Sequence, residues 1–365
     1  MATLTAPSVS VAFIEAAASA IQRGERGVIA MLIVDATEGL ATDYIIYDVT
    51  DIPESMTDAN KTAIKLALKG YVNAPAKILV HVIAASSAYA DGLAALATQK
   101  WNYLVCPTAE ADGVTSDIIS WIIAQRSNGM TYKAVLSNAA GDNPGIINVT
   151  SGATYEGNEI TAQLVACRIA GIIAGCPLTM SITYAPVADF SDCDRLTQAE
   201  LDTAVGEGKV VLMWDGEKVK VCRGVTSFLT TTDTKGDSFK KIKLVDAMDM
   251  IRDDITLTAQ DSYIGKYANS YDNKLLLVTA INAYFRELVA AGVLASGSCQ
   301  IDVAAQREYF LSKGSTFVVD GETIAVESAT EQQLKEGNTG SHVFLTAAIS
   351  LLDAIEDINL EIYIG

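Results

Sequence analysis

Short apolar runs alternate with helical segments through the first half of the chain, and this alternation constrains the fold more than any other feature. The runs VIAMLIVD (residues 28–35) and KILVHVIA (residues 77–84) contain almost no polar side chains. A strand has this composition when helices cover both faces of its sheet. Helix-length segments separate the runs, for example DIISWIIAQRSNG at residues 117–129. The alternation predicts an α/β fold with a doubly wound, mostly parallel sheet.

The pattern changes after about residue 190. Thr197 and Glu200 have the spacing of a helix capping box, and the pair Asp215-Gly216 between two alternating runs predicts a β-hairpin. Later elements are expected as three helices and a strand pair, at residues 239–255, 273–291 and 303–313 and around FVVDGETIAV. The second half of the chain is therefore predicted to be an α+β domain.

Both ends of the chain carry an alternating apolar segment. The apolar members are Val9, Val11 and Phe13 at one end and Ile358, Leu360, Ile362 and Ile364 at the other. Strict period-2 spacing predicts strands with one apolar face. A terminal strand commonly pairs within its own sheet, but an exposed apolar edge also pairs readily with another chain. Because the two ends match, we interpret both as strands donated to neighbouring subunits.

These patterns divide the chain into four parts. We predict an N-terminal arm, an α/β core domain, an α+β C-terminal domain and a C-terminal arm, at residues 1–20, 21–190, 191–352 and 353–365.

Composition excludes several classes of partner. The formal net charge of −18 opposes binding to nucleic acid through its phosphates, so no nucleic-acid partner is expected. No apolar run approaches the roughly 20 residues of a membrane helix, and no signal peptide is expected at the start, so we expect no membrane insertion. The six cysteines lack metal-binding or disulfide spacing. We predict reduced thiols and neither a metal nor a cofactor.

No catalytic constellation is apparent. The only two histidines are His81 and His342, and His81 lies inside an apolar strand and is predicted to be a core residue. The loop residues Ser137 and Ser151 have no plausible catalytic partner. The sequence contains neither a G-x-S-x-G elbow nor a phosphate-binding glycine loop. We predict that the protein is not an enzyme.

Two acidic clusters stand out in the sequence. The first comprises Asp189, Asp192 and Asp194. It lacks the glycine and the closing glutamate of a calcium-binding EF-hand loop. The second has helical spacing, and it comprises Asp246, Asp249, Asp253 and Asp254. We interpret the second as a solvated helical face, with a charged patch between subunits as the alternative.

Five stretches, in this order and spacing, carry a resemblance to a known family. They are PSVSVAFIE, QRGERGVIAML, GKVVLMWDGEKVKVCRGVTSF, NKLLLVTAINAYFRELVAAGVL and HVFLTAAISLLDAIEDINLEIYI. Together they resemble the tail sheath protein of contractile phage tails and phage-tail-like bacteriocins, in the compact form found in phages of Gram-positive bacteria. The resemblance covers essentially the whole chain.

The resemblance implies a structural subunit of a contractile sheath. Its subunits would form hexameric rings, stacked as a helical sheath around an inner tail tube, with baseplate and tail terminator proteins as further partners. It also implies that each arm adds a strand to the C-terminal domain of a neighbour, at a sheet made of part of FVVDGETIAV and residues 343–351. Assembly would take place in the bacterial cytoplasm and the product would be a virion tail or a tail-like particle.

Contraction would require flexible lengths beside the donated strands. The candidates are residues 16–20 and residues 352–357. Lys240, Lys241 and Lys243 are candidates for contact with the tube.

Two other classes of protein remain as alternatives. A doubly wound α/β enzyme with a C-terminal oligomerisation domain shares the predicted fold, and fold alone does not confer function. A different self-assembling protein, such as a tail tube, would be smaller and mainly β.

Overall fold

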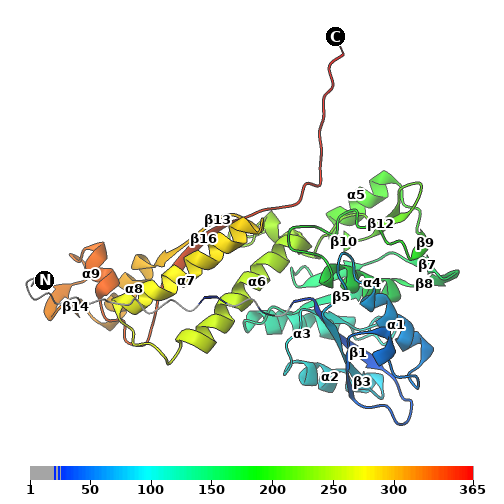
Figure 1. The fold of residues 1–365 in the computed structure, drawn as a ribbon, viewed down its shortest axis with the longest axis horizontal. Helices are drawn as coiled ribbons and strands as arrows, with labels where there is room; N and C mark the ends of the chain where they lie inside the picture. Colours follow the sequence, from blue (N-terminus) through cyan, green and yellow to red (C-terminus); the bar gives the residue numbers. More distant parts are fainter. Residues whose placement is uncertain (1–19, 22–23, 25, 365) are drawn as a thin grey trace, which may run out of the picture. The chain divides into compact units, whose positions relative to one another are not determined.

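The computed structural model describes residues 20–21, 24 and 26–364 (Figure 1). The chain divides into two compact units. The larger unit contains the chain from Gly24 to Asp254, together with Ala291–Ala295 and the segment from Leu351 onward. The smaller unit contains Ile255–Ala290 and Ser296–Ser350.

A seven-stranded sheet forms the centre of the larger unit. Its strand order is β10-β6-β5-β4-β1-β3-β2, and every neighbouring pair is parallel except β2 and β3. The strands are β1 (Val28–Val34), β2 (Asp43–Ile46), β3 (Lys77–Ile83), β4 (Tyr103–Val105), β5 (Lys133–Ser137), β6 (Ile146–Val149) and β10 (Lys209–Val210). The predicted doubly wound, mostly parallel sheet is confirmed.

Helices cover both faces of this sheet. They are α1 (Asp58–Leu68), α2 (Tyr89–Leu96), α3 (Thr115–Ser127) and α4 (Ala162–Ala174). Alternate residues of β1 enter different cores: Ile29 and Met31 pack with α1 and α4, whereas Ala30 and Leu32 pack with α2 and α3. The run of apolar residues in β1 is continuous because helices cover both faces of the sheet.

Gly171 allows α1 and α4 to approach closely. A Cβ atom at this position would lie 2.1 Å from the backbone oxygen of Ala67, so only glycine fits. The contact sets how tightly the two helices pack over the sheet.

The rest of the larger unit is built from α5 (Gln198–Gly206) and five short strands. These are β7 (Ala153–Tyr155), β8 (Asn158–Ile160), β9 (Phe190–Cys193), β11 (Leu212–Trp214) and β12 (Val219–Val221). The predicted capping box of α5 and the predicted hairpin of β11 and β12 are both present. The sheet of β8, β7 and β9 was not predicted. β10 lies beyond residue 190 and belongs to the large sheet, while the four-part division of the sequence stays a prediction.

Helices and two small sheets form the smaller unit. α6 (Ile242–Thr258) starts in the larger unit and continues into the smaller one, where α7 (Tyr271–Ala290), α8 (Val303–Lys313) and α9 (Glu331–Glu336) follow. One sheet pairs β14 (Thr316–Val319) with β15 (Glu322–Ala325), and the other pairs β13 (Leu294–Ile301) with β16 (Leu345–Leu351). β13 was not predicted, because LASGSCQI is rich in small residues.

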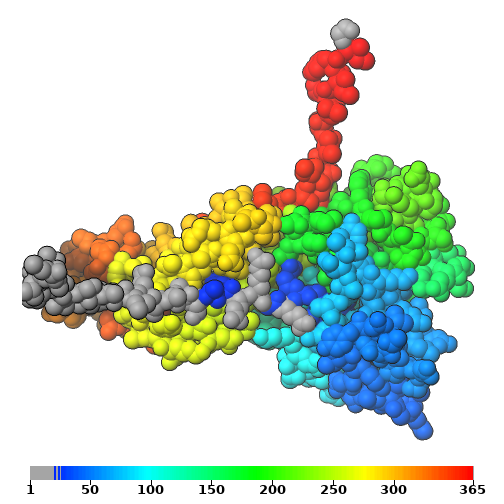
Figure 2. Space-filling model, in the orientation of Figure 1, coloured from blue at the N-terminus to red at the C-terminus, as the bar shows by residue number. Residues whose placement is uncertain are grey.

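After β16 the chain continues without helix or strand to Ile364. The sequence predicts a strand at residues 358–364, and a strand is not assigned there in the single chain. Figures 1 and 2 show this segment in red as extended chain.

Candidate functional site

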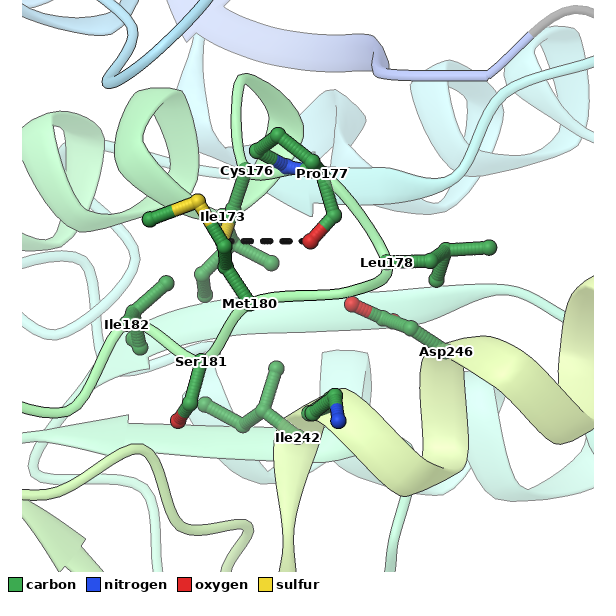
Figure 3. Close-up of a pocket in the computed structure, with 10 residues that line it drawn as sticks. Ile173, Cys176, Pro177, Leu178, Met180, Ser181, Ile182, Ile242 and Asp246 are labelled. Atoms are coloured by element: carbon green, nitrogen blue, oxygen red, sulfur yellow. Dashed lines mark hydrogen bonds between the residues drawn. The ribbon is translucent and has the colours of Figure 1, made fainter. Parts of the chain in front are cut away.

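The small cavities of the larger unit do not have the character of a substrate site. The cavity in Figure 3 has a volume of about 10 Å³, which is room for about one water molecule. Its lining comes from the end of α4, the following loop and the start of α6, and it is mostly apolar. A second cavity of about 30 Å³ lies beside Tyr103 and Lys133. Neither could enclose an organic substrate.

A wider, open depression of about 300 Å³ lies beside α5. Its polar side chains already stabilise local structure: Asp194 accepts a hydrogen bond from the backbone of Gly152, Ser151 from that of Leu212, and Glu200 closes the capping box. These groups have structural partners, so the depression offers no evident reactive group.

The two histidines are not arranged for catalysis in the described residues. His81 is buried in β3, as predicted, and its Nδ1 lies 2.7 Å from Asp43 Oδ1. His342 lies beside the ring of Tyr309, at 5.4 Å between ring centroids. Neither histidine has a hydroxyl or thiol nucleophile as hydrogen-bond partner among the contacts of the described chain.

Three of the four aspartates in the acidic cluster of α6 are buried, so the prediction of a solvated face was wrong for Asp246, Asp249 and Asp254, while Asp253 is exposed. Asp249 is 7% exposed and accepts hydrogen bonds from Arg126 at 2.9 and 3.0 Å and from Lys133 at 2.8 Å. Burial alone would raise the pKa of Asp249, but Lys133 and Arg126 hold this pKa below its ordinary value. Asp253 accepts a hydrogen bond from Thr131 at 2.6 Å. The cluster therefore fastens α6 to α3 and β5 within the larger unit.

The outer part of the C-terminal arm, residues 358–364, carries highly exposed apolar side chains, and Ile355 just before it is 86% exposed. Their exposed fractions are 83% for Ile358, 75% for Leu360, 76% for Ile362 and 96% for Ile364. In the described part of the chain, the backbone of residues 358–364 makes no hydrogen bond to any sheet. Such a segment has both the apolar face and the free backbone groups that strand pairing requires. The matching residues Val9, Val11 and Phe13 lie outside the described residues.

A cluster of side chains on the larger unit holds the base of this arm through Glu356. The Glu356 side chain is only 4% exposed. The hydroxyls of Ser181 and Thr183 lie 3.1 and 2.6 Å from its Oε1. Lys241 Nζ and Arg223 Nε lie 3.0 and 3.3 Å from its Oε2. Burial disfavours the charged form of Glu356, yet the hydrogen bonds from Thr183 and Lys241 leave its pKa below the ordinary value.

Neighbouring contacts extend this attachment. Lys241 also lies 2.5 Å from Asp353, Arg223 pairs with Asp357, and Lys243 donates a hydrogen bond of 2.6 Å to the carbonyl of Leu352. Residues 352–357 are thus held to the larger unit, and their prediction as a flexible connection was wrong. Of the three lysines predicted to contact a tube, Lys241 and Lys243 hold the arm and Lys240 pairs with Asp237.

The sheet of β13 and β16, most of which belongs to the smaller unit, has an exposed strand. It has two strands in the described chain, and most residues of β16 are exposed. A two-stranded sheet is marginally stable by itself and gains from an added strand. The sequence placed FVVDGETIAV in the same sheet, and this was wrong, because β14 and β15 pair only with each other among the described strands.

Comparisons with known families and proteins agree with one another. Residues 83–227 match the model of the phage tail sheath protein central domain, and residues 234–365 match that of the phage tail sheath C-terminal domain. The chain is 34% identical over 362 residues to the tail sheath protein of Clostridium phage phiCD119, covering 97% of this chain and 98% of the relative. It is 31% identical over 176 residues to the phage-like element PBSX protein XkdK of Bacillus subtilis, covering 47% of this chain and 38% of that protein.

Solved structures share the fold. The sheath tail protein of Desulfitobacterium hafniense superposes with a TM-score of 0.69 at 17% identity, covering 94% of this chain and all of that one. The sheath complex of the extracellular contractile injection system PVC, in the contracted state, superposes with a TM-score of 0.65 at 12% identity, covering 100% of this chain and 98% of that one. The α/β unit and the smaller unit are therefore both parts of a fold already seen in sheath proteins.

Proposed function

Because this chain belongs to the phage tail sheath family and is a structural subunit of a sheath, we propose that it polymerises as stacked hexameric rings around an inner tail tube. The subunit is part of a virion tail or a tail-like particle. No described helix is long and apolar enough to cross a membrane. Baseplate and tail terminator proteins complete the proposed set of partners, with assembly in the bacterial cytoplasm and no catalytic role for the subunit.

The exposed C-terminal arm is the observation that carries this proposal. Four large apolar side chains at alternate positions face solvent. Their exposure adds nothing to the stability of a single subunit and is typical of a surface that binds a partner. Adding the arm as a strand to the β13–β16 sheet of a neighbour would bury these side chains and satisfy the backbone groups. The alternation would fix the register, because a slip by one residue turns the apolar face to water. We propose the same role for Val9, Val11 and Phe13.

Strand donation suits a sheath that changes shape. The arms keep neighbouring subunits connected while the compact units move as rigid bodies. In this proposal the extended sheath is metastable, and contraction drives the tube through the envelope of the target cell. The alternative of a doubly wound enzyme has no observation in its favour.

Deletion of residues 358–365 tests the proposal. We expect a folded, soluble subunit with an unchanged unfolding midpoint, because the large side chains of residues 358–364 are mostly exposed to solvent. We expect that this variant forms no striated tubes under conditions in which the full chain assembles, as seen by negative-stain electron microscopy. Deletion of residues 1–14 is the parallel variant. Ordered tubes of normal length from either deletion would contradict the arm proposal.

A further inference from the structure

A built binding site for an acidic peptide segment lies on the larger unit. We propose that residues 353–357 are an intramolecular plug, which docks in this site and fixes the point at which the C-terminal arm leaves the subunit. We call the site the plug receptor, and it comprises Ser181, Thr183, Arg223, Lys241 and Lys243. Its ligand is the carboxylate-rich segment of this same chain.

Charge complementarity supports this assignment. The plug carries three carboxylates and no cation, and the receptor presents three cations and two hydroxyls. The chain has only 26 lysine and arginine residues against 44 acidic residues. Three cations beside one short segment are therefore more than the average composition of the chain would place there. Ion pairs between exposed side chains contribute little, but Glu356 is nearly enclosed and contacts four receptor side chains.

The receptor is assembled from three segments that the fold holds together without the plug. Ser181 and Thr183 follow α4, Arg223 follows β12, Lys241 directly precedes α6 and Lys243 is its second residue. The backbone of Ile242 donates a hydrogen bond of 3.1 Å to the carbonyl of Gly224, and Gly224 donates one of 3.0 Å to the hydroxyl of Thr183. These bonds fix the receptor groups before the plug binds, which lowers the entropic cost of docking.

Burial within the plug is concentrated at Glu356. Its side chain is 4% exposed, whereas Ile355 and Asp357 on either side are 86% and 85% exposed, and Ile358 is 83% exposed. Glu361, in the free arm, has only the hydroxyl of Tyr363 in the same arm as a partner in the described chain, at 2.6 Å. Glu356 and Glu361 therefore differ in how accessible they are to a protease, and this difference can be measured.

The plug is a property of one chain and does not depend on assembly, but its consequence for the sheath rests on the proposed function. Docking shortens the mobile length between subunit body and donated strand. A shorter tether raises the effective concentration of the strand at a nearby acceptor, as long as it can still span the gap. The pivot for arm movement is then at residues 357–358, beyond the docked segment.

Cleavage by a glutamate-specific endopeptidase tests the plug in the soluble full-length protein. Cleavage after Glu361 releases IYIG, and cleavage after Glu356 releases DINLEIYIG or DINLE, and mass spectrometry distinguishes these products. We expect cleavage after Glu356 to be about tenfold or more slower than after Glu361, because it requires undocking. Equal rates at the two glutamates of the wild-type protein would overturn the proposal, whatever any variant does.

Two variants identify the cause of the protection. The double substitution Arg223→Ala and Lys241→Ala is expected to bring the rate after Glu356 to within about threefold of the rate after Glu361, since receptor charges set the docked population. Lys240→Ala is the matched control, because Lys240 pairs with Asp237 and not with the plug, and it should leave the protection intact. Tryptophan fluorescence checks that each variant is folded. Protection that survives the double substitution in a folded protein would also overturn the proposal.

The outcome separates this proposal from the proposed function. An accessible Glu356 in a protein that forms normal sheaths contradicts the plug alone. A protected Glu356 in a protein that forms ordered sheaths without residues 358–365 contradicts arm donation alone.

Discussion

Two carboxylates in this protein, those of Asp249 and Glu356, are buried together with positively charged partners. Asp249 is enclosed with Lys133 and Arg126, and Glu356 is enclosed by the plug receptor. A carboxylate that is buried with its cations holds the segments that carry them in one arrangement. Removing one partner is destabilising, because it leaves a buried charge without a counter-charge. The spacing of acidic residues along α6 predicts a common face but cannot say what covers that face, because the covering side chains come from α3 and β5.

Replacing Asp249 with alanine should destabilise the larger unit by about 3–5 kcal/mol, because Lys133 would remain buried without its main counter-charge. Urea unfolding followed by tryptophan fluorescence measures this, since Trp101, Trp121 and Trp214 all lie in the larger unit. Asp237→Ala removes an exposed pair with Lys240 and is the control, with little change expected. A loss below about 1 kcal/mol in Asp249→Ala would show that the pair is not structurally important.

At the scale of elements, some strands can be recognised from the sequence and others cannot. β1 and β3 are recognisable because both of their faces are apolar. β13 is not, because its small residues fit beneath α7: a Cβ atom on Gly297 would lie 3.0 Å from the Phe285 ring. The C-terminal arm has a clear strand pattern and no partner within the described chain.

Aspartate on the two faces of the arm should have opposite consequences. Leu360→Asp places a charge on the apolar face that the proposed strand addition buries, so we expect sheath assembly to be lost. Asn359→Asp adds the same charge on the other face and should leave assembly largely intact. Pelleting of polymer in an ultracentrifuge measures both, and the midpoint of thermal unfolding should be unchanged in each. Equal assembly of the two variants would contradict a strand with one buried face.

At the scale of the whole molecule, the protein combines two compact units with a segment that is held at its base and exposed beyond it. The seven-stranded sheet and its helices supply a rigid body, since both faces of the sheet are covered. In the proposed function, the groups that connect subunits are backbone edges and apolar arms.

Mixing the full chain with the chain that lacks residues 358–365 should shorten sheaths. In the proposed assembly the shortened subunit keeps its β13–β16 sheet and can accept a strand, but it cannot donate the C-terminal one, so each incorporation removes one connection to a neighbouring subunit. We expect the mean tube length in electron micrographs to fall steadily as the fraction of deleted subunit rises. Tube length that is independent of this fraction would contradict donation by the C-terminal arm.

The sequence by itself determined the α/β class, the capping box of α5 and the hairpin at Asp215-Gly216, because each depends on residues that are close together in the chain. The resemblance to tail sheath proteins also came from local stretches in a fixed order. Only the tertiary structure decided that most of the acidic face of α6 is buried, that β13 pairs with β16, and that Glu356 is enclosed by side chains of the larger unit. Each of these depends on side chains brought together from distant segments, and no local pattern records which segments those are.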